Sequence, residues 1–159
     1  MEFNRAGYLL SATAVEATLE DIKAYFVTAI AGSSTRADLF ATLSLFLQDI
    51  KTLSPNHLIE CWIDGSFTSL KINPKDIDIV TFIDYRSFGE QLETMKSYTE
   101  RYRLSKLPLD LYLVRRYPEE HPYFIRFQSD RAYWLHLFSS TRKDKRGRSE
   151  AKGFVKLTW

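Results

Sequence analysis

Residues 76–83, Asp-Ile-Asp-Ile-Val-Thr-Phe-Ile, place two carboxylates in a segment that otherwise has the composition of a buried β-strand. Side chains two positions apart on a strand point to the same face, so Asp76 and Asp78 are expected side by side. A carboxylate in apolar surroundings is costly unless it is paired or binds a cation. The segment therefore predicts a strand that carries an acidic site on one face.

A third carboxylate, Asp110, lies in the apolar segment 108–114. If this segment is a strand, the leucines at 109, 111 and 113 line one face and Asp110 points to the other. Carboxylates brought together by neighbouring strands repel one another, and a divalent cation with oxygen ligands removes that repulsion. We therefore expect Asp76, Asp78 and Asp110 to bind Mg²⁺ or Mn²⁺.

A glycine and a serine, Gly65 and Ser66, follow a predicted strand at 58–63. Glycine permits a sharp turn or a close approach of the backbone. We expect this turn to open into a short helix, so that backbone N–H groups and the hydroxyl face an anion. A phosphate-binding turn beside metal-binding carboxylates indicates phosphoryl or nucleotidyl transfer.

Apolar periodicity predicts helices before and after these motifs. One face of a first helix carries residues 15, 19, 22, 26 and 30, with Thr13 and Glu16 as a capping box. A second helix buries residues 39, 43, 46, 47 and 50, and a third runs from a capping box at Ser87 and Glu90 to Tyr102. Beyond Val114 we expect a strand at 123–127, a short helix at 130–138 and an edge strand or tail at 154–157.

These elements predict one α+β domain over residues 1–159, a small mixed sheet flanked by helices. Its parts are N-terminal helices at about 13–52, a catalytic core at about 57–116 and a basic C-terminal segment at about 139–159. With 159 residues, 45% of them hydrophobic, the chain can bury one sizeable core. It has no apolar segment long enough to span a bilayer, no basic and apolar start typical of a secretion signal, and a single cysteine, Cys61. We therefore expect a cytoplasmic protein in which Cys61 is buried packing.

The turn Gly65-Ser66, the pair Asp76-Ile77-Asp78 and the later Asp110 together resemble the DNA-polymerase-β-like nucleotidyltransferase superfamily. Within it, the size is similar to that of small bacterial nucleotidyltransferases of toxin–antitoxin and abortive-infection loci. A longer match to a small bacterial family of that group covers 7–10, 34–36, 62–67, 73–78, Trp134 and 152–155.

The resemblance implies a polymerase-β-like fold and a role for each motif residue. Gly65 and Ser66 would hold the β- and γ-phosphates of a nucleoside triphosphate. Asp76 and Asp78 would bind the metal that carries the triphosphate. Asp110 would join them on a second metal that activates the attacking hydroxyl.

Other polar residues near these motifs have two readings each. Lys71 and Lys75 are phosphate contacts or solvated loop residues, and Lys75, beside Asp76, joins the phosphate-binding candidates. Arg36 reaches into the site or has a surface or capping role. Asp64, where the superfamily usually has an apolar residue, is expected to anchor a hydrogen bond and not a metal.

The basic segment contains Arg142, Lys143, Lys145, Arg146, Arg148 and Lys152, opposed by Asp144 and Glu150. It binds RNA or triphosphate, or it is a solvated loop. The residues Tyr133, Trp134 and His136 before it stack on a base or belong to the core.

The function expected from this pattern is metal-dependent transfer of a nucleoside monophosphate from a nucleoside triphosphate to a macromolecular acceptor. The acceptor is a protein hydroxyl or a tRNA 3′ end, and the partner is a cognate toxin or antitoxin. The alternatives are a non-catalytic, antitoxin-like module that neutralises or regulates a partner protein, and a nuclease with the same metal cluster. A nuclease would leave the Gly65-Ser66 turn without a purpose.

Overall fold

The computed structural model describes residues 1–11, 13–143 and 145–158 of the chain. In order, the elements are β1 (Ala14–Glu16), α1 (Leu19–Lys23), the π-helical turn η1 (Ala24–Thr28), α2 (Arg36–Leu53), β2 (Glu60–Asp64), β3 (Ile77–Asp84), α3 (Tyr85–Glu90), α4 (Leu92–Arg103), β4 (Leu109–Arg116), α5 (Phe124–Phe138) and β5 (Phe154–Thr158). No helix among the described residues is long and apolar enough to cross a membrane.

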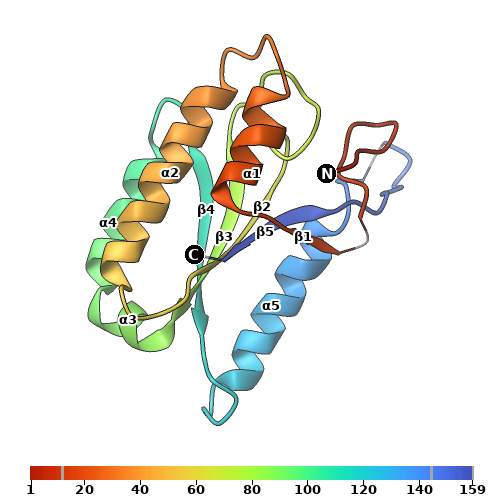
Figure 1. Cartoon of the computed structure of the whole chain (residues 1–159). Coiled ribbons are helices and arrows are strands. Elements are labelled where there is room, and N and C mark those ends of the chain that lie inside the picture. The colour runs from red at the N-terminus through yellow and green to blue at the C-terminus, as the bar shows by residue number, and fades with distance from the viewer. Residues whose placement is uncertain (12, 144, 159) are drawn as a thin grey trace.

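The strands form one mixed sheet in the order β1-β5-β2-β3-β4. The central strand β2 pairs antiparallel with both β3 and β5, whereas β3 with β4 and β1 with β5 are parallel pairs. The expected α+β class with a mixed sheet flanked by helices is confirmed. Figure 1 shows α2 and α4 on one side of this sheet and α5 on the other.

Alternation along the strands builds a separate apolar cluster on each face of the sheet. Odd-numbered side chains of β2, β3 and β4 pack with those of α1, η1, α2 and α4 in the larger cluster. Even-numbered side chains, among them Trp62, Phe82 and Val114, pack on α5. The predicted apolar face of α2 is buried in the larger cluster, since Leu39, Leu43, Phe46, Leu47 and Ile50 are all fully or almost fully buried.

The N-terminal helix starts later than the periodicity predicted. Residues 14–16, expected in its first turn, form β1 and pair with β5. The capping box of α1 is made by Thr18 and Asp21, so the prediction of Thr13 and Glu16 was wrong. β-Pairing with a distant strand overrode the local periodicity here, which sequence spacing alone does not report.

The third predicted helix is two helices, α3 and α4, with a break at Gln91. Its cap was also misplaced, because Asp84 accepts from the backbone N–H of Arg86 and Ser87 lies inside α3. The predicted strand at 123–127 is wrong, since α5 begins at Phe124 and continues to Phe138. Packing of Phe127, Trp134 and Phe138 against one sheet face stabilises this longer helix.

The last strand was expected at an edge or in a tail, and this was wrong. β5 lies between β1 and β2 and is bonded on both sides. Three of its residues, Phe154, Val155 and Leu157, are buried. Residues 154–158 are therefore part of the sheet interior and not an appendage of the basic segment.

Candidate functional site

Three aspartates lie in a row across the sheet where β2 ends and β3 and β4 begin. Asp64 is opposite Asp78 in the antiparallel pair, and Asp78 is level with Asp110 in the parallel pair. Residues in register on neighbouring strands share a face, so all three point to the face that α5 covers. Since α5 ends at Phe138, this end of the sheet is left free for a site.

The turn after β2 is built against the central aspartate of this row. Gly65 has a φ of +82°, a conformation that favours glycine. A Cβ atom at Gly65 would lie 1.7 Å from Oδ2 of Asp78, so no other residue fits without displacing that carboxylate. Residues 65–68 form a turn and not the short helix that was expected. The close approach of the backbone to Asp78 explains why glycine is required here.

Arg36 holds the loop that follows this turn. Its side chain is completely buried, and its guanidinium donates at 2.7 Å to the carbonyls of Phe67 and Ser69 and at 2.6 Å to that of Lys71. A further bond of 2.7 Å reaches the carbonyl of Phe26 in η1. Burial lowers the pKa of Arg36 to about 10. The surface role considered for Arg36 is therefore wrong, and its donors are used on backbone beside the site.

Asp64 forms an ion pair with Lys152, which confirms that it anchors a local polar contact. Both residues are buried, and the Lys152 ammonium also donates at 3.0 Å to the carbonyl of Phe138 at the end of α5. Burial raises the pKa of Asp64, and the attraction of Lys152 opposes that shift. Lys152 is thus a structural residue that joins β2, α5 and the start of β5, and not part of a solvated basic loop.

All six residues predicted for catalysis and phosphate binding line one cavity of about 890 Å³. They are Gly65, Ser66, Lys75, Asp76, Asp78 and Asp110. The structure therefore brings together side chains from β2, β3, β4 and the connecting loop. The cations Arg5, Lys71 and Arg142 line the same cavity, so its lining combines acidic and basic side chains. Such a distribution suits an anionic ligand that carries its own cation.

The three aspartates predicted as metal ligands have no ion-pair partner among the described residues. Among the described residues, no ion pair reaches Asp76, Asp78 or Asp110. Burial raises the pKa of Asp78 to about 6, helped by the nearby charges of Asp76, Asp64 and Asp110 and opposed by Arg142. The hydroxyl of Tyr112 donates to Asp110 at 3.4 Å. In the row of Asp64, Asp78 and Asp110, the central carboxylate therefore has no positive charge paired with it among the described residues.

A bound cation would supply the missing positive charge, although the described residues alone do not supply a full set of metal ligands. Within the described ranges no three Asp, Glu, His or Cys side chains are gathered as a metal site. Mg²⁺ in nucleotide enzymes is held by one or two carboxylates together with substrate phosphates and water. The hard oxygen donors of Asp78 and Asp110 agree with that pattern.

The N-terminal segment is a part of the site that sequence reasoning left without a role. Residues 5–8 line the cavity, and Gly7 has a φ of +83°. The carbonyl of Gly7 accepts from the N–H of Leu70 at 2.8 Å, and that of Leu9 accepts from Gly153 at 2.9 Å. The sequence signal for this part of the site was the segment 7–10 of the family match, which contains a glycine beside an aromatic residue.

The remaining candidates are structural or lie outside the site. Trp134 is buried and packs on Tyr112, with ring centroids 4.5 Å apart, whereas Tyr133 is exposed. Cys61 is buried as predicted, and burial raises the pKa of its thiol to about 12. Of the basic segment, Arg142 and Lys152 are placed beside the site, and Asp144 lies outside the described residues.

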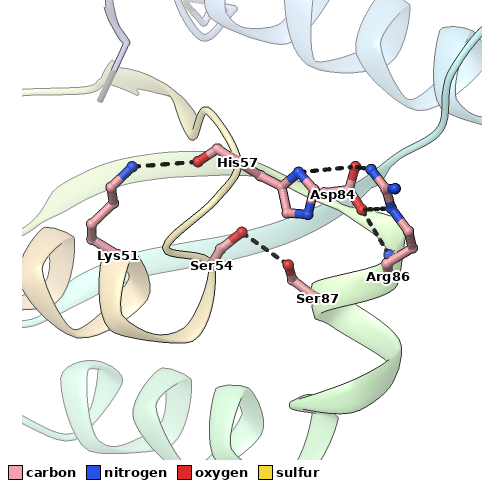
Figure 2. Close-up of polar contacts among 6 residues, drawn as sticks. All are labelled: Lys51, Ser54, His57, Asp84, Arg86 and Ser87. Carbon is pink, nitrogen blue, oxygen red and sulfur yellow. Dashed lines mark hydrogen bonds and ion pairs between the residues drawn. The ribbon is translucent and has the colours of Figure 1, made fainter.

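The opposite end of β3 holds a different polar cluster, shown in Figure 2. Asp84 accepts from the backbone N–H and the side chain of Arg86, both at 2.9 Å, and lies 3.8 Å from Nδ1 of His57. The hydroxyls of Ser54 and Ser87 are 3.0 Å apart beneath it. These contacts join the end of α2 to the start of α3.

Comparison with known protein families gave a match over almost the whole chain. A family model described as a family of unknown function, DUF6932, matches residues 1–158. The chain belongs to this family. No curated protein and no solved structure matched it. The match covers β1 to β5, so every residue of the cavity lies within the DUF6932 region.

Proposed function

We propose that this protein is a metal-dependent nucleotidyltransferase with a polymerase-β-like core. The observation that carries the proposal is the register of Asp78 with Asp110, with the Gly65 turn packed directly on the carboxylate of Asp78. Two carboxylates level on neighbouring strands, next to a half-buried glycine turn, suit a cation bound to a triphosphate. This is the arrangement that the sequence resemblance leads us to expect.

The carboxylates of Asp76, Asp78 and Asp110 would hold Mg²⁺ or Mn²⁺. When bound, the metal ions neutralise phosphate charge and lower the pKa of an attacking hydroxyl. The raised pKa of Asp78 shows that burial and the neighbouring carboxylates make its ionised form unfavourable. A bound divalent cation would stabilise that ionised form, which supports the assignment.

The triphosphate would lie against the turn at 65–66 and the basic residues that line the cavity. Ser66 offers its hydroxyl, whereas the N–H of Gly65 donates to the carboxylate of Asp64. Lys71 and Lys75 are exposed and line the cavity, so they can contact phosphate oxygens without breaking an ion pair among the described residues. Arg142 is exposed on the side of the cavity that follows α5.

The reaction would join an acceptor hydroxyl to the α-phosphorus of the nucleotide. A bond forms between the hydroxyl oxygen and the α-phosphorus, and the bond from that phosphorus to the bridging oxygen of the β-phosphate breaks. Pyrophosphate leaves with that oxygen, and the hydroxyl proton passes to the carboxylate of Asp110. The acceptor we propose is a protein hydroxyl or a tRNA 3′ end. The setting we propose, from the same resemblance, is cytoplasmic toxin–antitoxin or phage defence.

The test is transfer of label from each of the four α-³²P-labelled nucleoside triphosphates in Mg²⁺ or Mn²⁺. The acceptors are tRNA, the protein itself and the product of the adjacent gene. We expect transfer by the wild type and none by Asp78→Asn, while Asp84→Asn at the other end of β3 is the matched control. Absence of transfer to all three acceptors with all four nucleotides would contradict the proposal.

A binding measurement distinguishes a cavity that binds no metal–triphosphate from a labelling assay that lacks the right acceptor. Mg²⁺ with a non-hydrolysable triphosphate should raise the thermal midpoint of the wild type by mass action and leave that of Asp78→Asn unchanged. If neither protein responds, the cavity does not bind a metal–triphosphate.

A further inference from the structure

A second cavity, of about 870 Å³, runs along the free edge of β4. β4 is the last strand in the sheet order, so one of its edges has no neighbouring strand among the described residues. Side chains of α3 and α4 form one wall of the cavity and those of α5 form the other. Figure 1 shows α4 and α5 on opposite faces of the sheet, with β4 between them. The cavity is therefore a groove with a strand edge as its floor.

The backbone groups that face the groove follow from the pairing of β4 with β3. The carbonyl of Pro108 accepts from the N–H of Ile77, so even-numbered residues of β4 bond to β3. The N–H and C=O groups of Leu111, Leu113 and Arg115 then point away from the sheet. Unpaired groups of this kind are a template for an added strand.

One of these outward groups is covered by a side chain. Arg103, at the end of α4, donates at 2.5 Å to the carbonyl of Leu111 and lies over the ring of Tyr112. A charged side chain on an edge strand is a common protection against unwanted strand pairing. Arg103 is exposed, so an incoming backbone N–H can replace its guanidinium at that carbonyl.

The lining of the groove combines apolar side chains with an excess of basic ones. Leu92, Met95 and Leu104 lie on the α4 side. The charged lining residues are four cations, Lys96, Arg103, Arg115 and Arg126, and two acids, Glu100 and Asp130. Alternating apolar and acidic side chains on an added strand would match both features.

We propose that the edge of β4 is a docking site for an extended, acidic segment of a partner protein, which adds as a sixth strand. This surface is separate from the aspartate cavity and does not depend on the proposed enzymatic activity. A second copy of the chain is a poorer occupant by charge, because its own β4 ends in Arg115 and Arg116 and would meet the same cations.

The probe is a fluorescein-labelled peptide of eight residues in which valine and glutamate alternate, with both ends blocked. Its length matches the eight residues of β4. We expect saturable binding by fluorescence polarisation at low salt, and binding at least about tenfold weaker for the analogue in which lysine replaces glutamate. Equal binding of the two peptides, or no binding of either, would overturn the proposal.

Backbone methylation distinguishes strand addition from adsorption by charge. One analogue is N-methylated at every valine and a second at every glutamate, so each blocks the N–H groups on one edge of the peptide. Strand addition predicts that one analogue binds like the parent and that the other binds at least about tenfold more weakly. If both bind like the parent, charge alone holds the peptide and the proposal fails.

Substitutions in the groove test strand addition by changing the protein instead of the peptide. Leu113→Pro removes an outward N–H that β3 does not use, and should weaken the valine–glutamate peptide at least about tenfold. Should that variant fail to fold, the pair Arg115→Glu and Arg126→Glu is expected to reverse the preference between the glutamate and lysine peptides. Lys23→Glu on α1 is the matched control and should change neither affinity.

Sedimentation of the wild type alone tests the competing occupant. A monomer at micromolar concentration agrees with the proposal. A dimer that Leu113→Pro converts to a monomer would assign the groove to a second copy of this chain and overturn the proposal.

Discussion

The two ends of β3 each carry an aspartate, and their surroundings are opposite. At the far end, Asp84 caps α3, bonds Arg86 and lies near His57 (Figure 2), and the bond from Arg86 holds its pKa below the usual value. At the near end, Asp78 has no ion pair among the described residues, and burial and neighbouring carboxylates raise its pKa to about 6. One carboxylate is used by the fold, and the other has no ion-pair partner among the described residues.

This contrast shows that the two ends of a single strand can treat a carboxylate in opposite ways. The polar cluster around Asp84 satisfies its own hydrogen bonds and joins α2 to α3. The carboxylates around Asp78 repel one another, which destabilises the folded state. The apolar clusters on both faces of the sheet provide enough stability to offset this cost. Sites that bind ligands are expected where a fold tolerates such a deficit.

The largest expected effect is the loss of activity in Asp78→Asn. We expect label transfer to fall by at least about 10²-fold, since the charge that faces the metal and phosphates is removed. Asp84→Asn should retain wild-type transfer. Equal losses in the two variants, measured by initial rates at saturating nucleotide, would show that the ends of β3 do not differ in this way.

Next in size is the effect of Gly65→Ala on stability. Its new Cβ meets the Asp78 carboxylate and its backbone is strained, so we expect a loss of about 2–4 kcal/mol in the free energy of unfolding. Gly32→Ala is the matched control, because Gly32 has a φ of +80° but open space around it. It should lose only about 1 kcal/mol. Urea denaturation would measure both, and equal losses would mean that Asp78 moves aside freely.

A smaller effect is the pH dependence that Asp78 gives to the fold. Its pKa is about 3.9 in the unfolded chain and about 6 in the folded one, so ionisation destabilises the fold as pH rises through this window. In chelator, the wild type should lose on the order of 1 kcal/mol relative to Asp78→Asn between about pH 4 and 6, after allowance for solvent screening. Denaturation midpoints across this range would check it, and parallel curves for the two proteins would contradict the assignment.

The smallest expected effect is that of Asp84→Ala at neutral pH. Loss of the α3 cap should cost about 1 kcal/mol and leave label transfer unchanged. Because the folded pKa of Asp84 is lowered, its contribution is present above the unfolded pKa and is lost as pH falls through the folded value. The advantage of the wild type over the variant should thus be lost in acid, whereas at Asp78 acid removes a disadvantage of the wild type. A stability difference between wild type and Asp84→Ala that grows in acid would contradict the role of ionised Asp84 as the cap of α3.

The sequence was sufficient for the parts of the fold that local patterns determine. The strand with Asp78, the strand with Asp110, the turn at Gly65 and the buried face of α2 were all found from periodicity and turn chemistry. The shared cavity followed because strand-borne carboxylates on one face of adjacent strands converge. Their role in catalysis stays a prediction.

Long-range pairing is what local patterns could not supply. The strand at 14–16 depends on β5 at the far end of the chain, and the burial of Lys152 depends on Asp64. Arg36 gave no sign in its own neighbourhood that the loop carbonyls of Phe67 and Ser69 would surround it. In each case the deciding partner is remote in sequence, so its contribution enters only when the fold is assembled.

The position of β5 also sets an order of events during synthesis. It inserts between β1 and β2, two strands made earlier, and the adjacent Lys152 completes the buried pair with Asp64. Until residues 152–158 are made, β1 and β2 lack the strand that joins them, and Asp64 beside the Gly65 turn lacks its partner Lys152. Contacts of such sequence separation form slowly. The turn at Gly65 should therefore reach its final packing only after residues 152–158 are made, although the segment with Asp76, Asp78 and Asp110 precedes them.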